Sequence, residues 1–309
     1  MKYSYAIVAD IACDLSPEIR ERFGVDGYLK TYMSTPDADN IEGSLDLSDA
    51  ELDAFYLSLK ANSNKYKTAV PGLDEFVSFF ETFLIQGKDI LALSISSALS
   101  ATYNLMVCAK EALCKKYPER KIFVINSMRY SLALGLLTVK ACGLRAEGLS
   151  VEQNAETMEK IKNTVHQMGP IDDLFWVASK GRISHAKAVF GTALGIKPMG
   201  DFDSDGMVTV LTKVSGYDKA LKTTIEYIKK TIKDANEQII FIAHSVRKKQ
   251  AEMLAMLIEE KVKPKEVVIS NIYPLTGINT GPGLVAAYYL GTEITDLKRE
   301  KEIIMEIKI

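Results

Sequence analysis

The sequence predicts a two-domain α/β protein, and three observations support this fold class. The 309 residues are enough for two domains with separate cores. In the first half, short apolar runs typical of strands alternate with helical patterns, which indicates a parallel sheet. After about residue 166 the pattern changes to strands, helices and a hairpin signal. We expect an N-terminal α/β domain at 1–166 and a C-terminal α+β domain with a mixed sheet at 167–309.

The first domain is expected to hold a parallel sheet flanked by helices. Its strand-like runs lie at 5–9, 90–95 and 122–125. Helical patterns separate these runs and follow them, at 74–87, 98–117 and 130–147. A polar helical segment, 150–167, runs toward a Gly-Pro pair and marks the expected boundary.

The second domain is expected to mix strands and helices. Strands are expected at 174–178, 239–243 and 267–272, with an edge strand at 303–309. Helices are expected at 184–195, 217–234, 246–262 and 284–290. The turn Ser-Asp-Gly at 204–206 lies between alternating apolar residues, which predicts a β-hairpin.

The composition is that of an ordinary folded protein. Hydrophobic residues make up 47% and charged residues 25%, and 38 basic against 40 acidic residues give a net charge of −2. No broad field recruits nucleic acid or an anionic membrane, so we expect no nucleic-acid partner and at most transient membrane contact. The start of the chain does not resemble a signal peptide, and no apolar run is long enough to span a membrane. We expect a cytoplasmic protein whose four cysteines stay reduced.

A cluster of hydroxyl side chains lies where one expected strand meets a helix. The segment ILALSISSALSATY contains Ser94, Ser96, Ser97, Ser100 and Thr102. Such hydroxyls can cap the helix by accepting hydrogen bonds from its free N–H groups. The same N–H groups and the helix dipole can instead hold an anionic ligand. Taken alone, this segment favours capping.

Two more polar turns precede expected helices. The first is Ser-Lys-Gly-Arg-Ile-Ser at 179–184, and the second is Asn-Thr-Gly-Pro-Gly at 279–283, where glycines permit close backbone approach. Each can be explained as a turn with an N-cap. Three polar turns of this kind are more than helix capping alone usually requires, so a role in ligand binding is a second possible explanation.

The expected helix at 74–87 carries an unusually wide apolar arc. Phe76, Phe80 and Phe83 belong to it. Packing against the sheet is the simpler explanation, and the wall of an apolar cavity is the alternative. A long apolar cavity that ends in hydroxyl groups would suit a fatty acid.

Metal binding is not expected. The segment 201–206, DFDSDG, matches the first six positions of a calcium loop, but Thr212 stands where that loop needs a glutamate. We expect the hairpin turn to account for its aspartates. His166, His185 and His244 lie far from one another along the chain and from every cysteine, so no zinc pair forms locally. We also find no phosphate loop and no Gly-x-Ser-x-Gly elbow, and we expect no cofactor.

Five motifs, in order along the chain, resemble those of the DegV family. Asp-Ile-Ala-Cys-Asp-Leu at 10–15 resembles the family's DSTCDL opening, and 96–103 resembles its SSGLSGTY turn. Residues 180–184 resemble KGGRIS, Ile-Lys-Pro at 196–198 matches outright, and 280–283 resembles the end of HTGPG. The resemblance covers nearly the whole chain. It implies a protein that binds a long-chain fatty acid and carries it for a separate fatty acid kinase.

The resemblance also implies site residues. The ligand carboxylate would be bound by Thr68, Ser96, Ser97 and Asn279. Arg182 and Thr280 would lie at the site mouth or contact the partner, and the acyl channel would be lined by Phe76, Phe80 and Phe83. The family's TSQPS segment is TAVPG here, and Asn279 replaces the histidine of HTGPG. An amide can donate a hydrogen bond but cannot become cationic, which bears on the kinase partnership.

The rival hypothesis is an acyl hydrolase or transferase with a serine nucleophile. It requires a base within hydrogen-bonding reach of the serine, and His185 or His244 would have to supply it. We expect instead a carrier subunit that does no catalysis itself.

Overall fold

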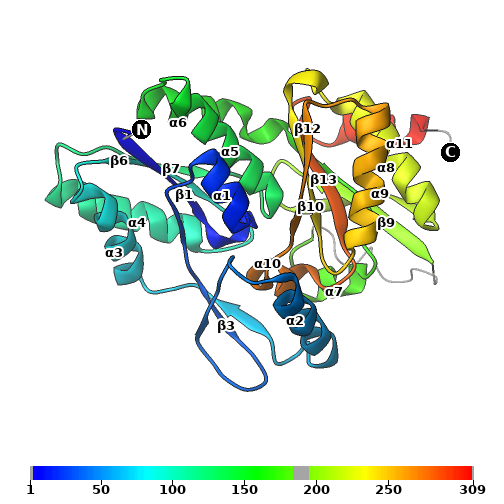
Figure 1. Ribbon diagram of the computed structural model, residues 1–309, viewed down its shortest axis with the longest axis horizontal. Helices are drawn as coiled ribbons and strands as arrows, with labels where there is room; N and C mark the ends of the chain where they lie inside the picture. Colours follow the sequence, from blue (N-terminus) through cyan, green and yellow to red (C-terminus); the bar gives the residue numbers. More distant parts are fainter. Residues whose placement is uncertain (1–2, 184–194, 308–309) are drawn as a thin grey trace. The chain divides into compact units, whose positions relative to one another are not determined.

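The computed structural model describes residues 3–183 and 195–307, which fold into two compact units (Figure 1). Unit 1 comprises Met1–Asp46 and Asn64–Lys162, and unit 2 comprises Leu47–Ser63 and Asn163–Ile309. The expected single boundary at residue 166 differs from this division in two ways. The residues that follow Lys162 already belong to unit 2, and so does the excursion at 47–63.

Unit 1 is built on the expected parallel sheet. Its strand order is β2-β1-β6-β7, and every neighbouring pair is parallel. The strands are β1 (Tyr5–Asp10), β2 (Gly27–Leu29), β6 (Asp89–Ser94) and β7 (Ile122–Asn126). A small antiparallel sheet, β4-β3-β5, is formed by β3 (Tyr32–Ser34), β4 (Ile41–Glu42) and β5 (Lys67–Ala69).

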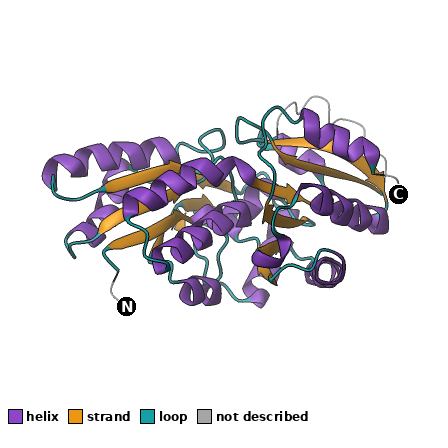
Figure 2. Ribbon diagram, turned by 90° about the horizontal axis from the view of Figure 1, so that it is seen from above, coloured by secondary structure: helices purple, strands orange, loops and turns teal. Residues whose placement is uncertain are grey.

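Helices cover both faces of the unit 1 sheet (Figure 2). They are α1 (Pro17–Phe23), α3 (Leu73–Leu84), α4 (Thr102–Lys116), α5 (Leu132–Ala146) and α6 (Val151–Ile161). On one face, Phe76 and Phe80 of α3 and Met106 of α4 are fully buried against Val8 and Ile90 of the sheet. Their spacing along α3 puts these apolar residues on one side of the helix, and burial of that side stabilises it.

Unit 2 contains the expected mixed sheet, in the order β12-β11-β13-β8. β11 pairs parallel with β12 and antiparallel with β13, and β13 pairs antiparallel with β8. The strands are β8 (Val165–Met168), β11 (Ile239–His244), β12 (Glu266–Asn271) and β13 (Val285–Leu290). The hairpin predicted at 204–206 is confirmed, because β9 (Ile196–Phe202) and β10 (Val208–Ser215) pair antiparallel across that turn.

The helices of unit 2 are α2 (Asp49–Ala61), α7 (Leu174–Ser179), α8 (Tyr217–Thr231), α9 (Lys248–Lys261), α10 (Pro274–Thr280) and α11 (Lys298–Glu306). Leu221, Ile228 and Leu254 of α8 and α9 pack on Ile240 and Ile242 of β11. The excursion helix α2 is held on this unit by Tyr56, whose hydroxyl donates to the Ile272 carbonyl oxygen at 2.8 Å.

Three elements of unit 2 differ from the sequence-based expectation. The segment 174–178 is part of helix α7, because the Asp173 carboxylate caps it by accepting from the Trp176 N–H at 3.0 Å. The segment 284–290 contains strand β13, which is buried on both faces and so lacks the usual alternation. The chain end forms helix α11 and not an edge strand. The helix expected at 184–195 falls almost wholly outside the described residues.

The helix expected at 150–167 is also shorter than predicted. α6 ends at Ile161, and β8 follows as an edge strand of the unit 2 sheet.

His166 lies on β8, fully buried, with Nδ1 2.5 Å from Asp201 Oδ2 and Nε2 2.7 Å from the Thr292 carbonyl oxygen. Asp201 therefore belongs to a buried hydrogen-bond network. The sequence had suggested instead that this aspartate serves the hairpin turn.

Candidate functional site

The carboxyl edge of the unit 1 sheet is rich in polar side chains. Because β1, β6 and β7 are parallel, the residues that follow them lie at the same edge of the sheet. That edge carries Asp10, Ser96, Ser97, Asn126, Ser127, Arg129 and Ser131. It includes two of the sequence-predicted carboxylate-binding residues.

Ser96 and Ser97 form the turn that leaves β6. Ser96 is fully buried, and its Oγ accepts a hydrogen bond from the Ala98 N–H at 3.3 Å. Ser97 is exposed, and its Oγ accepts from Asn126 Nδ2 at 2.7 Å. The Asn126 Oδ1 in turn accepts from the Ser97 N–H at 3.2 Å. In the described part of the chain, neither serine hydroxyl donates to an acceptor.

The other hydroxyls of this segment form local hydrogen bonds, but the N-cap residue of α4 is Ala101, which makes no side-chain cap hydrogen bond. Ser94 Oγ donates to the Ile95 carbonyl oxygen at 3.0 Å. Ser100 Oγ accepts from the Thr102 N–H at 3.3 Å, at the start of α4, and lies 2.9 Å from the Thr102 hydroxyl. Ser94, Ser100 and Thr102 therefore have local bonding roles, whereas Ser96 and Ser97 keep a hydroxyl proton to donate.

Asp10 is a buried acid at this edge that the sequence did not single out as a site residue. It is 2% exposed, and Oδ1 accepts from the Ala12 N–H at 2.8 Å. Burial raises the pKa of this carboxyl to about 6, and the hydrogen bond from the Ala12 N–H opposes the shift. The signal that could have revealed it is its position directly after the first apolar strand.

Arg129 is a buried cation at the same edge. Its side chain is 1% exposed, and Nη1 donates to the Met128 carbonyl oxygen at 2.8 Å. Its own backbone carbonyl oxygen accepts from the Ser96 N–H at 2.9 Å, which connects the arginine segment to the serine turn. Asn126 and Arg129 follow the strand predicted at 122–125. As with Asp10, their position just after a strand could have revealed them as site residues.

The remaining predicted site residues lie elsewhere. Thr68 is an exposed residue of β5, in the small sheet of unit 1, where it pairs with Met33. Asn279 and Thr280 belong to unit 2 and end the short helix α10. The Asn279 side-chain amide donates to the Leu275 carbonyl oxygen at 3.0 Å, and the Thr280 hydroxyl donates to that of Thr276 at 3.1 Å.

The turn after α10 depends on its glycines. Gly281 has a φ of 75°, and a Cβ there would lie 2.7 Å from the Trp176 ring. Trp176 itself donates from Nε1 to the Ile278 carbonyl oxygen at 3.0 Å. The motif Thr-Gly-Pro-Gly is therefore explained locally by close packing between α7 and the end of α10.

Arg182 is a half-buried residue of unit 2. Its Nη1 donates to the Lys180 carbonyl oxygen at 2.7 Å. Lys180 Nζ donates to the Ser63 carbonyl oxygen at 3.4 Å. Burial, together with the nearby charge of Arg182, lowers the pKa of the Lys180 ammonium. This turn carries two basic groups beside α7.

The three phenylalanines proposed for an acyl channel belong to the core of unit 1. Phe76 and Phe80 are fully buried and Phe83 is 8% exposed, and all three pack in the cluster formed by α3, α4 and the sheet. Packing in the core of unit 1 therefore explains the wide apolar arc of α3. A channel lined by these rings remains a prediction.

The histidines all come from the second half of the chain. His166 is held in the buried network with Asp201, His185 lies outside the described residues, and His244 ends β11 in unit 2. Unit 1, which carries Ser96 and Ser97, has no histidine in its sequence. Among residues 3–183 and 195–307, no group of three metal-ligand side chains converges, and no helix could cross a membrane.

Comparisons with known proteins agree on one family. The model of the family described as "Uncharacterised protein, DegV family" matches residues 4–292. A DegV domain-containing protein of Clostridium perfringens is 34% identical over 289 residues, which span 93% of this chain and 97% of that protein.

Several solved structures share the fold. A DegV family protein of Ruminococcus gnavus, refined with vaccenic acid, gives a TM-score of 0.82 at 22% identity, over 93% of this chain and 100% of that one. A stearic acid-binding protein of Eubacterium ventriosum gives 0.80 at 21% identity, over 93% and 98%. With the family model matching nearly the full length, this chain belongs to the DegV family.

Proposed function

We propose that this protein binds one long-chain fatty acid and holds its carboxylate at the serine turn of unit 1. The free hydroxyl protons of Ser96 and Ser97 carry this proposal. Each oxygen accepts a hydrogen bond from the protein, and neither hydroxyl has an acceptor among the described residues, so both O–H groups are available to donate. A carboxylate is the acceptor that suits such donors, because hydrogen bonds to a charged group are about twice as strong as neutral ones.

The relatives support this class of ligand. The Ruminococcus gnavus protein was refined with vaccenic acid, and a Eubacterium eligens relative was loaded with heptadecanoic acid. At about 0.8 kcal/mol per buried methylene, a chain of roughly 14 to 18 carbons gains on the order of 10 kcal/mol of gross burial free energy. That is enough for tight binding after the cost of association.

The other head-group and channel residues follow from the family resemblance. Thr68 and Asn279 are assigned to the carboxylate, Arg182 and Thr280 to the mouth or a partner contact, and Phe76, Phe80 and Phe83 to the channel. Phosphorylation of the bound carboxylate is assigned to a separate kinase that this protein serves as carrier. The protein itself acts in the cytoplasm, without a cofactor and without a catalytic group.

Serine substitutions test the proposal against a matched control. Ser97→Ala and Ser96→Ala each remove one charge-assisted hydrogen bond, which costs about 1.5–3 kcal/mol. We expect fatty acid affinity of the delipidated protein to fall roughly ten- to hundredfold. Ser94→Ala is the control, because that hydroxyl already donates to Ile95. Equal affinity in all three variants would remove the carboxylate from this turn.

The same variants discriminate the rival hydrolase or transferase. Incubation with an activated acyl ester should release no product beyond the uncatalysed rate, and free acid should be retained at one molecule per protein. Steady turnover that Ser96→Ala abolishes would establish an enzyme instead of a carrier.

A further inference from the structure

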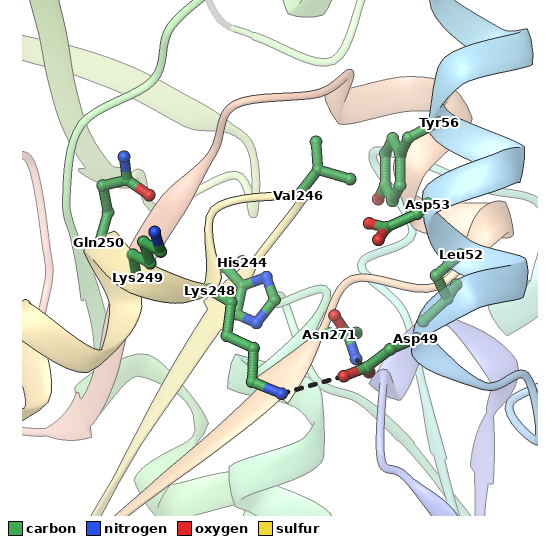
Figure 3. Close-up of a pocket in the computed structure, with 10 residues that line it drawn as sticks. All are labelled: Asp49, Leu52, Asp53, Tyr56, His244, Val246, Lys248, Lys249, Gln250 and Asn271. Atoms are coloured by element: carbon green, nitrogen blue, oxygen red, sulfur yellow. Dashed lines mark hydrogen bonds and ion pairs between the residues drawn. The ribbon is translucent and has the colours of Figure 1, made fainter.

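Unit 2 has a pocket that shares no residue with the proposed fatty acid site. It lies between helix α2, the start of helix α9 and the carboxyl ends of β11 and β12 (Figure 3). Its volume is about 240 Å³, which is smaller than most ligand pockets and suits a small molecule or a single head group. The lining residues used below come from α2 (Asp49, Asp53), from the ends of β11 and β12 (His244, Asn271) and from the first turn of α9 (residues 248–250).

The first turn of α9 offers free donors to this pocket. Lys248, Lys249 and Gln250 all line it, and they are the first three residues of a 14-residue helix. No side chain caps the helix, and the first helical N–H to be paired is that of Ala251, which donates to Arg247. In the described part of the chain these three N–H groups have no acceptor. They and the helix dipole favour negative charge.

His244 supplies an independent indication of a ligand. Its side chain is 5% exposed, lines the pocket, and has no hydrogen-bond partner for Nδ1 among the described residues. Figure 3 shows the ring between the start of α9 and the residues of α2, with Asn271 beside it. A buried polar atom without a partner costs free energy, and a bound group that accepts from Nδ1–H would recover it.

The charges around the pocket are divided between paired and unpaired groups. The Asp49 carboxylate accepts from Lys248 Nζ at 3.0 Å and from Asn271 Nδ2 at 3.0 Å, and these two donors lower its pKa. Asp49 and Lys248 therefore neutralise each other. Lys249 on α9 and Asp53 on α2 remain as the cation and anion that a ligand would meet.

We propose that this pocket binds the oxyanion of a small molecule, a phosphate or carboxylate group, at the start of α9. The N–H groups of residues 248–250, the His244 ring and the Lys249 ammonium hold the anion. Asp53 lies on the opposite side, where it disfavours a bare anion and accepts a hydrogen bond from a hydroxyl or ammonium elsewhere on the molecule. This site does not depend on fatty acid binding.

Anion titration of the full chain tests the proposal. Inorganic phosphate and, separately, acetate are added at fixed ionic strength to ¹⁵N-labelled protein, and the amide resonances of residues 248–250 are followed. We expect saturable shifts at these amides with at least one anion. Phosphate alone would assign a phosphate group, and acetate alone would assign a carboxylate.

Four variants make the test specific. Lys249→Gln and His244→Leu should each weaken anion binding about tenfold, whereas Asp53→Asn should tighten it by removing a like charge. Lys261→Gln is the matched control, because it removes the same charge from the opposite end of the same helix and should change nothing. No saturable shift with either anion would overturn the proposal, and so would equal weakening in Lys249→Gln and Lys261→Gln.

Discussion

At the scale of single residues, the proposed head-group site depends on which serine hydroxyls already have an acceptor within the protein. Ser94 and Ser97 are both serines near the end of β6, but Ser94 donates to its neighbour while Ser97 accepts from Asn126. The sequence shows a cluster of hydroxyls and cannot separate these roles, because the separation depends on Asn126, 29 residues further along the chain.

Asp10 leads to a prediction about pH and stability. Its pKa is raised to about 6 in the folded protein, so the folded state binds a proton that the unfolded state has lost. Its contribution to stability is therefore complete below about pH 4 and is lost as the pH rises through 6. The shift corresponds to about 3 kcal/mol. Asp10→Asn should flatten the decline in unfolding free energy between pH 4 and 6 in denaturant titrations.

The control for that experiment is Asp46→Asn, at an exposed aspartate of the same unit. It should leave the slope between pH 4 and 6 unchanged from wild type. An Asp10→Asn curve parallel to wild type through this range would mean that Asp10 is ionised in the folded protein.

Asn279 gives a second prediction at this scale. Its amide does not titrate, so residue 279 itself contributes no pH dependence to the fatty acid affinity of the wild-type protein between pH 5 and 8. Asn279→His should introduce one, with binding tightening as the pH falls through about 6.5, since an imidazolium attracts the carboxylate. Affinities measured at fixed salt across this range test both statements. Two identical curves would place residue 279 outside the head-group site.

At the scale of elements, the sequence-based prediction was most accurate for the short apolar strands of the parallel sheet. The strands at 5–9, 90–95 and 122–125 are confirmed to within one residue at each end, because each is a short, buried apolar run in a parallel sheet. The run at 174–178 has the same apolar character but forms a helix, and its Asp173 cap was the signal that would have distinguished it. Strand β13 was missed because burial on both faces erases alternation.

Pairing between distant elements could not be predicted from the sequence. Asp201 accepts from the Gln167 N–H at 2.8 Å, from the Tyr227 hydroxyl at 2.8 Å, and from His166, which joins β8, β9 and α8. The sequence places these residues in three separate segments. Only the folded chain brings them into one buried network.

That network gives a prediction about the stability of unit 2. In Asp201→Asn, an amide N–H₂ replaces a carboxylate oxygen that accepts hydrogen bonds, so at least one neighbouring donor loses its acceptor. The substitution also removes the negative charge beside His166. Leaving a buried hydrogen-bond donor without its acceptor costs about 1–3 kcal/mol. The free energy of unfolding should fall by that amount in denaturant titration. Asp203→Asn, in the hairpin turn, is the comparison and should cost less; equal losses would argue against the network as a main stabiliser of the fold.

At the scale of the whole molecule, the family and the two four-stranded sheets could be recognised from the sequence, whereas the division into units could not. Five motifs in order identified the family, and the family model now covers residues 4–292. The excursion at 47–63 belongs to unit 2 because Tyr56 and Asp49 of α2 bond to Ile272, Asn271 and Lys248. These are contacts across more than 190 residues of sequence, which local patterns do not encode.

The central claim is that this chain carries a fatty acid, and mass spectrometry of the purified protein tests it most directly. Protein made in bacteria should release, on extraction with organic solvent, one fatty acid of roughly 14 to 18 carbons per chain, because burial of that many methylenes outweighs the cost of association. After delipidation it should take up one equivalent of added fatty acid at micromolar concentration. Extracts without fatty acid, together with no uptake by the delipidated protein, would contradict the claim.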